Sequence, residues 1–95
     1  MTAYVIASID VTDPAGYEEY RKLAAASLGK YQGKFIVRGG ASVPLEGSWN
    51  PPRVVVCEFP SMELAQAWYN SPEYAPAIAI AKRTAKRDLI AVEGV

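Results

Sequence analysis

The chain contains no histidine and only one cysteine, and these two shortages exclude several kinds of chemistry. Without histidine it lacks the commonest haem ligand and the usual proton shuttle at neutral pH. Cys57 lies within the apolar run Val54–Phe59 and has no partner for an intrachain disulfide, which is typical of a small core residue in a reducing compartment. We therefore expect a cytoplasmic protein with no cofactor and no metal.

An excess of charge of either sign is also missing, because ten Lys and Arg residues balance ten Asp and Glu residues. A balanced protein has no long-range field to attract nucleic acid or an anionic membrane. No apolar run is long enough to cross a membrane, and the first residues lack the basic region of a signal peptide. We expect neither nucleic acid nor a membrane among the partners.

What the chain does have is a high hydrophobic share, 51% of its 95 residues. A chain of this length forms one domain, residues 1–95, and buries about two-thirds of the surface that it exposes when unfolded. One subunit cannot cover so much apolar surface, which favours association with a second copy.

Apolar periodicity and helix caps predict four strands and two helices. Asp13 followed by Pro14 indicates the start of a helix, which ends before Gly29. Ser61 begins a second helix, which is bent or split at Asn70–Pro72, where Ser71 can cap a new helical segment that begins at Pro72. The strands are predicted at Tyr4–Asp10, which is central, and at Lys34–Arg38, Arg53–Phe59 and Asp88–Glu93.

The order β-α-β-β-α-β predicts an α+β, ferredoxin-like fold: an antiparallel four-stranded sheet with both helices on one face. Strict alternation places Phe35 and Val37 on one face of the second strand and Arg38 on the other. The uncovered sheet face is rich in aliphatic residues. We therefore expect a homodimer in which this open face packs against the same face of a second copy.

A group of motifs spans nearly the whole chain. They are Tyr17–Tyr20, Gly33–Gly40, Leu45–Gly47, Glu58–Ser61, Ala67–Tyr74 and Arg83. Together they resemble the DUF1330 family of the dimeric α/β-barrel superfamily. The resemblance implies a barrel made by two paired sheets, a small pocket in each subunit with Arg83 turned inward, and no defined activity. Ala75–Pro76 replaces the commoner polar pair of that family, which implies a different local shape of the pocket wall.

Arg38 and Glu46 are the first candidate site residues, on either side of the Gly39–Gly40 turn. An inward guanidinium at Arg38 or Arg53 would bind a carboxylate in bidentate fashion. The alternatives are an ion pair with Glu46 or Glu58, or a solvated strand end. Glu46 itself would serve as a general base if buried, or would simply hold Arg38 in place. The two glycines need no ligand, since a turn with positive φ explains them.

Trp68, Ser71 and Tyr74 recur every three residues and so present an indole, a hydroxyl and a phenol on one side of the chain. They predict a pocket wall, although core packing and a helix cap explain the same residues. Ser71 is excluded as a nucleophile because no histidine can activate it. The remaining cations of the run that contains Arg83 are expected to be solvated, namely Lys82, Lys86 and Arg87.

The sequence thus favours a protein that binds a small polar or carboxylate-bearing metabolite in a pocket beside the dimer-forming sheet. That pocket is predicted to be lined by Arg38, Glu46, Trp68, Ser71, Tyr74 and Arg83. Two alternatives stay open: a cofactor-independent enzyme acting on a small reactive metabolite, and a non-catalytic dimerisation module. Any catalysis would depend on Glu46, a tyrosine or an arginine, or on the reactivity of the substrate itself.

Overall fold

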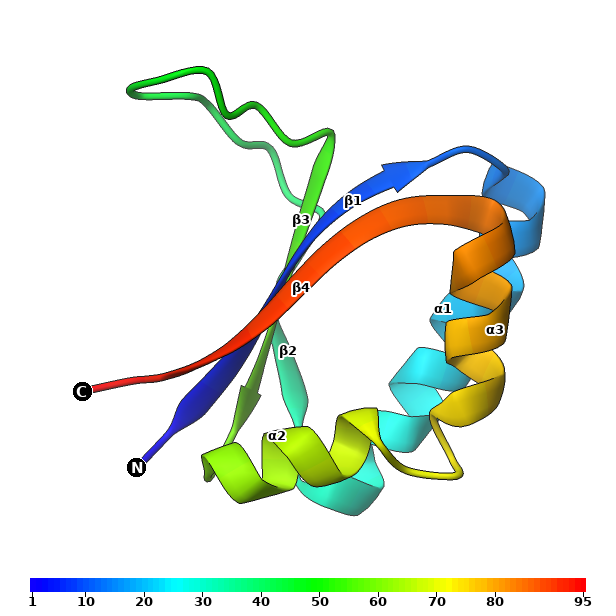
Figure 1. Cartoon of the computed structure of the whole chain (residues 1–95), viewed down its shortest axis with the longest axis vertical. Helices are drawn as coiled ribbons and strands as arrows, with labels where there is room; N and C mark the ends of the chain where they lie inside the picture. Colours follow the sequence, from blue (N-terminus) through cyan, green and yellow to red (C-terminus); the bar gives the residue numbers. More distant parts are fainter.

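The computed structural model describes residues 1–95 as one antiparallel sheet with its helices on one face (Figure 1). The strands are ordered β2-β3-β1-β4, so β1 is central as predicted. None of the three α-helices is long and apolar enough to cross a membrane. The elements are β1 (Ala3–Val11), α1 (Pro14–Leu28), the 3-10 helix η1 (Gly29–Tyr31), β2 (Lys34–Arg38), β3 (Arg53–Phe59), α2 (Met62–Tyr69), α3 (Ala75–Thr84) and β4 (Ala85–Glu93).

The predicted caps start the helices. Asp13 accepts a hydrogen bond from the Gly16 amide at the start of α1, and Ser61 accepts one from the Leu64 amide at the start of α2. The predicted break in the second helix is confirmed, but α3 begins at Ala75 rather than at Pro72. The residues between form a turn that ends with Tyr74, whose amide donates to the Ser71 hydroxyl at 3.1 Å.

The register of β2 departs from strict alternation. Phe35 lies opposite Cys57 and Arg38 opposite Val55, with a bulge between Phe35 and Val37. One extra residue reverses the facing of all that follow, so Arg38 shares the helix-covered face with Phe35 and Val37 moves to the open face. The predicted pairing of Phe35 with Val37 on one face is therefore wrong.

The last strand begins at Ala85, three residues before the predicted Asp88. In this register Arg87 lies opposite Ile9, a fully buried residue of β1. Because residues opposite one another share a face, Arg87 lies on the helix-covered face. The expectation that it is solvated at a helix end is wrong.

The core lies between the helices and the sheet face that they cover. Phe59, Trp68 and Tyr74 form its aromatic part, with ring centroids 5.5 Å apart for Phe59 and Trp68 and 4.1 Å for Trp68 and Tyr74. Cys57 is a buried free thiol in the same core, as predicted. The core interpretation of Trp68 and Tyr74 is thus confirmed.

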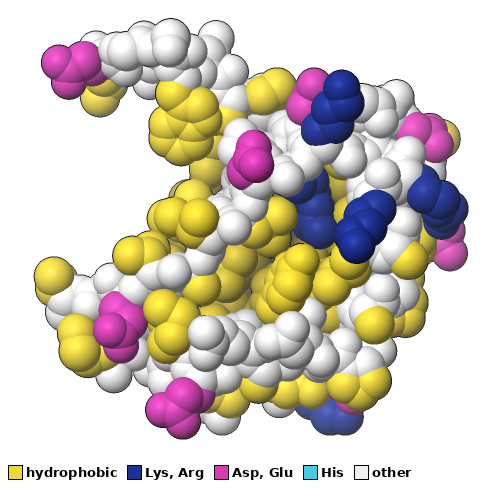
Figure 2. All heavy atoms as spheres, viewed as in Figure 1, with side chains coloured by type: hydrophobic (Ala, Val, Ile, Leu, Met, Phe, Trp, Pro, Cys, Tyr) yellow, Lys and Arg dark blue, Asp and Glu magenta, His cyan; other side chains and the backbone are white.

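Two apolar surfaces remain without a partner. The open sheet face exposes Ile36, Val37, Ile90 and Val92. The connection from 39 to 52 has no regular structure and projects from the sheet as an arm that exposes Leu45 and Trp49 (Figure 1). Hydrophobic side chains line the recess between this arm and the strands (Figure 2).

Candidate functional site

A pocket lies between the helix-covered face of the sheet and helices α1 and α2, with a cavity volume of about 40 Å³ that widens to about 520 Å³ of empty space when its open mouth is included. Four arginines, eleven hydrophobic residues and no acidic residue line it. Figure 2 shows Lys and Arg atoms sunk into a hydrophobic hollow between the sheet and the helices. The lining residues are Val5, Ala7, Ile9, Tyr17, Tyr20, Arg21, Ala24, Phe35, Arg38, Arg53, Val55, Cys57, Trp68, Arg87 and Leu89.

Three of the four arginines of the pocket have no carboxylate partner within the chain. The structure contains three ion pairs, Arg21 with Glu18, Lys30 with Glu73, and Lys34 with Glu58. Arg38, Arg53 and Arg87 have no carboxylate partner, although the guanidinium stays charged at any pH that a protein tolerates. The sequence-based alternative of an ion pair between these arginines and Glu46 or Glu58 is not realised.

Arg53 is the most strongly constrained of the three. Its Nε is buried and makes no hydrogen bond. Its guanidinium lies against Gly39, where a Cβ atom would overlap the arginine head, and Gly39 has a φ of +74°. The predicted positive φ is therefore confirmed, and the missing side chain also makes room for Arg53.

Arg38 and Arg87 each stack on an aromatic ring of the pocket wall. The Arg38 Cζ lies 4.3 Å from the centre of the Phe35 ring, and the Arg87 Cζ lies 5.0 Å from that of Tyr20. Ile9 pairs with Arg53 on one side and with Arg87 on the other. At the usual spacing of strands, these two arginines are therefore about 10 Å apart along the sheet.

Two tyrosines of α1 form the opposite wall. The rings of Tyr17 and Tyr20 stack with centroids 4.8 Å apart. Burial raises the pKa of Tyr17, against the opposing charges of Arg87 and Arg53, and burial also raises the pKa of Tyr20. Both phenols are therefore protonated hydrogen-bond donors at neutral pH.

Cys57 is the one thiol in the pocket wall. Burial raises its pKa to about 11, although the positive charge of Arg38 acts in the opposite direction. The thiolate is the nucleophilic form, so the neutral thiol at pH 7 is unreactive. No cluster of three His, Cys, Asp or Glu side chains suited to a metal ion occurs in the structure. What the pocket offers is charge recognition, hydrogen bonding and apolar contact.

The structure brings some predicted site residues together and separates others. Arg38 and Trp68 line the pocket. Tyr74 lies behind the wall, where its hydroxyl contacts Tyr20 and Arg87. Glu46 is exposed on the arm and Arg83 is exposed in the last turn of α3, so neither reaches the pocket.

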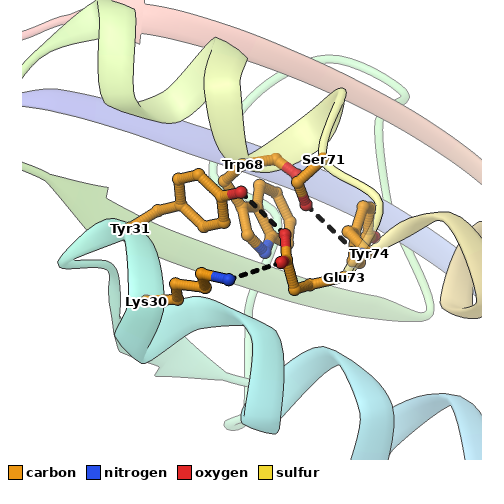
Figure 3. A network of polar contacts seen from close by, with 6 residues as sticks. All are labelled: Lys30, Tyr31, Trp68, Ser71, Glu73 and Tyr74. Atoms are coloured by element: carbon orange, nitrogen blue, oxygen red, sulfur yellow. Dashed lines mark hydrogen bonds and ion pairs between the residues drawn. The ribbon is translucent and has the colours of Figure 1, made fainter.

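Ser71 lies in the turn between α2 and α3, where its hydroxyl accepts a hydrogen bond from the Tyr74 amide (Figure 3). It therefore caps this turn and not α3, whose N-cap is Tyr74. In the same turn, the Glu73 carboxylate accepts hydrogen bonds from Lys30 at 2.6 Å and from the Tyr31 hydroxyl at 2.7 Å. These bonds fasten the turn to η1. The turn therefore holds the helices together, and none of its residues, 70–74, lines the pocket.

Four residues that line the pocket are not predicted from the sequence, namely Arg87, Arg21, Tyr17 and Tyr20. Arg53 is predicted only as an alternative to Arg38. A signal for Arg87 exists in the alternation of Ala85, Arg87 and Leu89, which continues the inward positions of the last strand. This alternation is hard to recognise because Arg87 follows a helix, and basic residues are also common in the last turn of a helix. For the tyrosines, spacing alone does not distinguish a pocket wall from the core.

The fold and the family agree. The model of the domain of unknown function DUF1330 matches residues 2–95. The chain belongs to this family. No functionally curated protein matches it.

Solved structures resemble the chain over nearly its whole length. The RPA0582 protein of unknown function from Rhodopseudomonas palustris has a TM-score of 0.81 at 15% identity, over 99% of this chain and 82% of that one. A dimeric ferredoxin-like protein of unknown function from Jannaschia sp. CCS1 has a TM-score of 0.79 at 12% identity, over 99% and 100%. SnoaB from Streptomyces nogalater, a cofactor-independent oxygenase, has a TM-score of 0.67 at 14% identity, over 99% and 92%. At these identities the likeness establishes the ferredoxin-like fold alone.

Proposed function

We propose that this DUF1330 protein binds a small organic anion, a carboxylate on an apolar body, in the pocket between sheet and helices. The observation that carries the proposal is the buried Nε of Arg53, which has no hydrogen-bond partner in a pocket with no acidic residue. A buried charged group without a partner is costly to maintain. A carboxylate supplies both the missing charge and a bidentate acceptor, and the apolar walls hold the rest of the molecule.

The protein works as a cytoplasmic homodimer in this proposal, with the open sheet face as the contact. The exposed aliphatic side chains of that face support this assembly, and similar solved structures are of dimeric proteins. The buried free thiol is compatible with a reducing compartment.

A second candidate is a cofactor-independent enzyme acting on a small reactive metabolite. The support is the fold shared with SnoaB together with protonated tyrosines and arginines around one pocket. Catalysis would then depend on Tyr17 or Tyr20, since Glu46 lies outside the pocket. The remaining alternative is a dimerisation module that binds no ligand. In that case the pocket arginines only order the arm, so their loss would lower the stability of the protein.

The test uses Trp68, which lines the pocket, as a fluorescent reporter. The chain has two tryptophans, so Trp49→Phe leaves Trp68 as the single emitter. Titration with benzoate should change its emission in a saturable manner, and the neutral isostere benzamide should bind at least roughly tenfold more weakly. Arg53→Gln should reduce benzoate binding to the level of benzamide. Equal binding of the two compounds, or unchanged benzoate binding in Arg53→Gln, would refute the proposal.

A further inference from the structure

Three polar groups meet where Tyr20 of α1 and Arg87 of β4 line the pocket. The hydroxyls of Tyr20 and Tyr74 are 2.7 Å apart, and the Arg87 Nη1 donates to both, at 2.8 Å and 3.1 Å. All three side chains are buried or half-buried. The direction of the hydrogen bond between the two tyrosines decides what the pocket presents to a ligand.

The donors and acceptors of this group can be counted. Arg87 only donates, so both phenol oxygens act as acceptors toward it. One tyrosine then donates its proton to the other, and the second tyrosine keeps a proton that needs an acceptor elsewhere. Since buried donors are nearly always satisfied, the tyrosine with access to a further acceptor is the one that keeps a free proton.

Only Tyr20 has that access. Tyr74 is fully buried, does not line the pocket, and its hydroxyl has no partner other than Tyr20 and Arg87. Its proton must therefore go to the Tyr20 oxygen. Tyr20 lines the pocket, so its own proton is free to point into the cavity.

We infer that Tyr20 is a directed hydrogen-bond donor of the pocket, and that the ligand carries a second oxygen acceptor at the end opposite its carboxylate. The inference rests on the proposed function, because it takes Arg53 and Arg38 as the carboxylate end. The row Arg53, Ile9, Arg87 separates the two ends by about 10 Å at the backbone, with apolar residues between them. This arrangement selects oxo- or hydroxy-carboxylates with an apolar spacer over simple monocarboxylates.

The experiment compares 4-acetylbenzoate with 4-ethylbenzoate, which have nearly the same shape but differ in the carbonyl acceptor. In the Trp49→Phe background we expect 4-acetylbenzoate to bind roughly fivefold to tenfold more tightly, as one hydrogen bond provides. Tyr20→Phe should remove this preference. Tyr74→Phe should keep it, because Tyr20 retains its proton.

Each other outcome is informative. If neither compound binds, the proposed function fails. Three results would keep the carboxylate site but refute Tyr20 as a directed donor. The two compounds bind equally well to the wild-type pocket, the preference for 4-acetylbenzoate persists in Tyr20→Phe, or that preference is seen only in Tyr74→Phe. Thermal unfolding without ligand gives a second readout: Tyr20→Phe leaves the buried Tyr74 proton without an acceptor and should lower Tm more than Tyr74→Phe. The reverse order would also refute the inference.

Discussion

Arg53 is held in place on one side and unsatisfied on the other. Gly39 receives its guanidinium, yet its Nε has no partner, so the backbone orients a charge that the protein itself does not neutralise. An arginine kept for stability would be paired or solvated instead. Replacement of the Arg53 side chain should therefore raise the free energy of unfolding while it weakens ligand binding.

The first prediction concerns Arg53→Met. Removal of an unpaired half-buried charge should raise the free energy of unfolding by about 1 kcal/mol and abolish benzoate binding. Urea denaturation followed by circular dichroism measures the first effect. Arg83→Met, at an exposed position, is the control and should stay within about 0.5 kcal/mol of wild type. A destabilised Arg53→Met protein would instead favour the module without a ligand.

The second prediction uses the neighbouring glycines as a matched pair. Gly39→Ala places a side chain at positive φ and against Arg53, so it should lower the free energy of unfolding by about 1–2 kcal/mol and weaken benzoate binding. Gly40→Ala meets no atom within 4 Å and should leave both quantities unchanged. Equal effects of the two substitutions on binding would show that Gly39 does not position Arg53.

At the scale of elements, the helix starts and most strand bounds follow from local signals. Asp13 with Pro14, and Ser61, fix where α1 and α2 begin because each satisfies backbone amides of the first turn. The bulge in β2 leaves no comparable signal, since Ile36 is as good a strand residue as its neighbours. The bulge decides that Arg38 enters the pocket, so the most important part of the site was the least predictable from sequence.

The turn between α2 and α3 gives a pH prediction. Hydrogen bonds from Lys30 and Tyr31 lower the pKa of Glu73 from 4.5 to about 2. The unfolded chain therefore takes up a proton at higher pH than the folded protein does. This contribution to stability is complete above about pH 4.5 and is lost as the pH falls through 2.

Glu73→Gln should therefore be less stable than wild type at pH 7, and the two unfolding free energies should converge as the pH falls from 4.5 to 2. Denaturation at a series of pH values measures the convergence. Glu63→Gln, an exposed glutamate of α2 without an ion pair, is the control. Parallel curves for Glu73→Gln and wild type would contradict the assigned cause.

At the scale of the whole molecule, the open sheet face explains where the high hydrophobic share of the chain is placed. Ile90 is 62% exposed there, and Leu45 of the arm is 93% exposed. A single copy leaves these side chains in water, and exposed apolar surfaces of this kind commonly contact another molecule.

The corresponding prediction concerns association. Ile90→Asp introduces a charge into the proposed contact and should weaken the dimer by roughly a hundredfold or more in Kd. Analytical ultracentrifugation across a concentration series measures the change. Ala79→Asp, on the exposed side of α3, should leave association unchanged. A monomeric wild-type protein, or a dimer unaffected by Ile90→Asp, would exclude this face as the interface.

The Cys57 thiol provides a chemical probe of access to the pocket. It is the only sulfhydryl in the chain, and it is buried in the wall of the pocket. A small alkylating reagent has to enter the pocket to reach it, so the rate of labelling reports how accessible the pocket is. Any compound that fills the space beside it will slow that rate, which allows unmodified protein to be screened for its natural ligand without a fluorescent label.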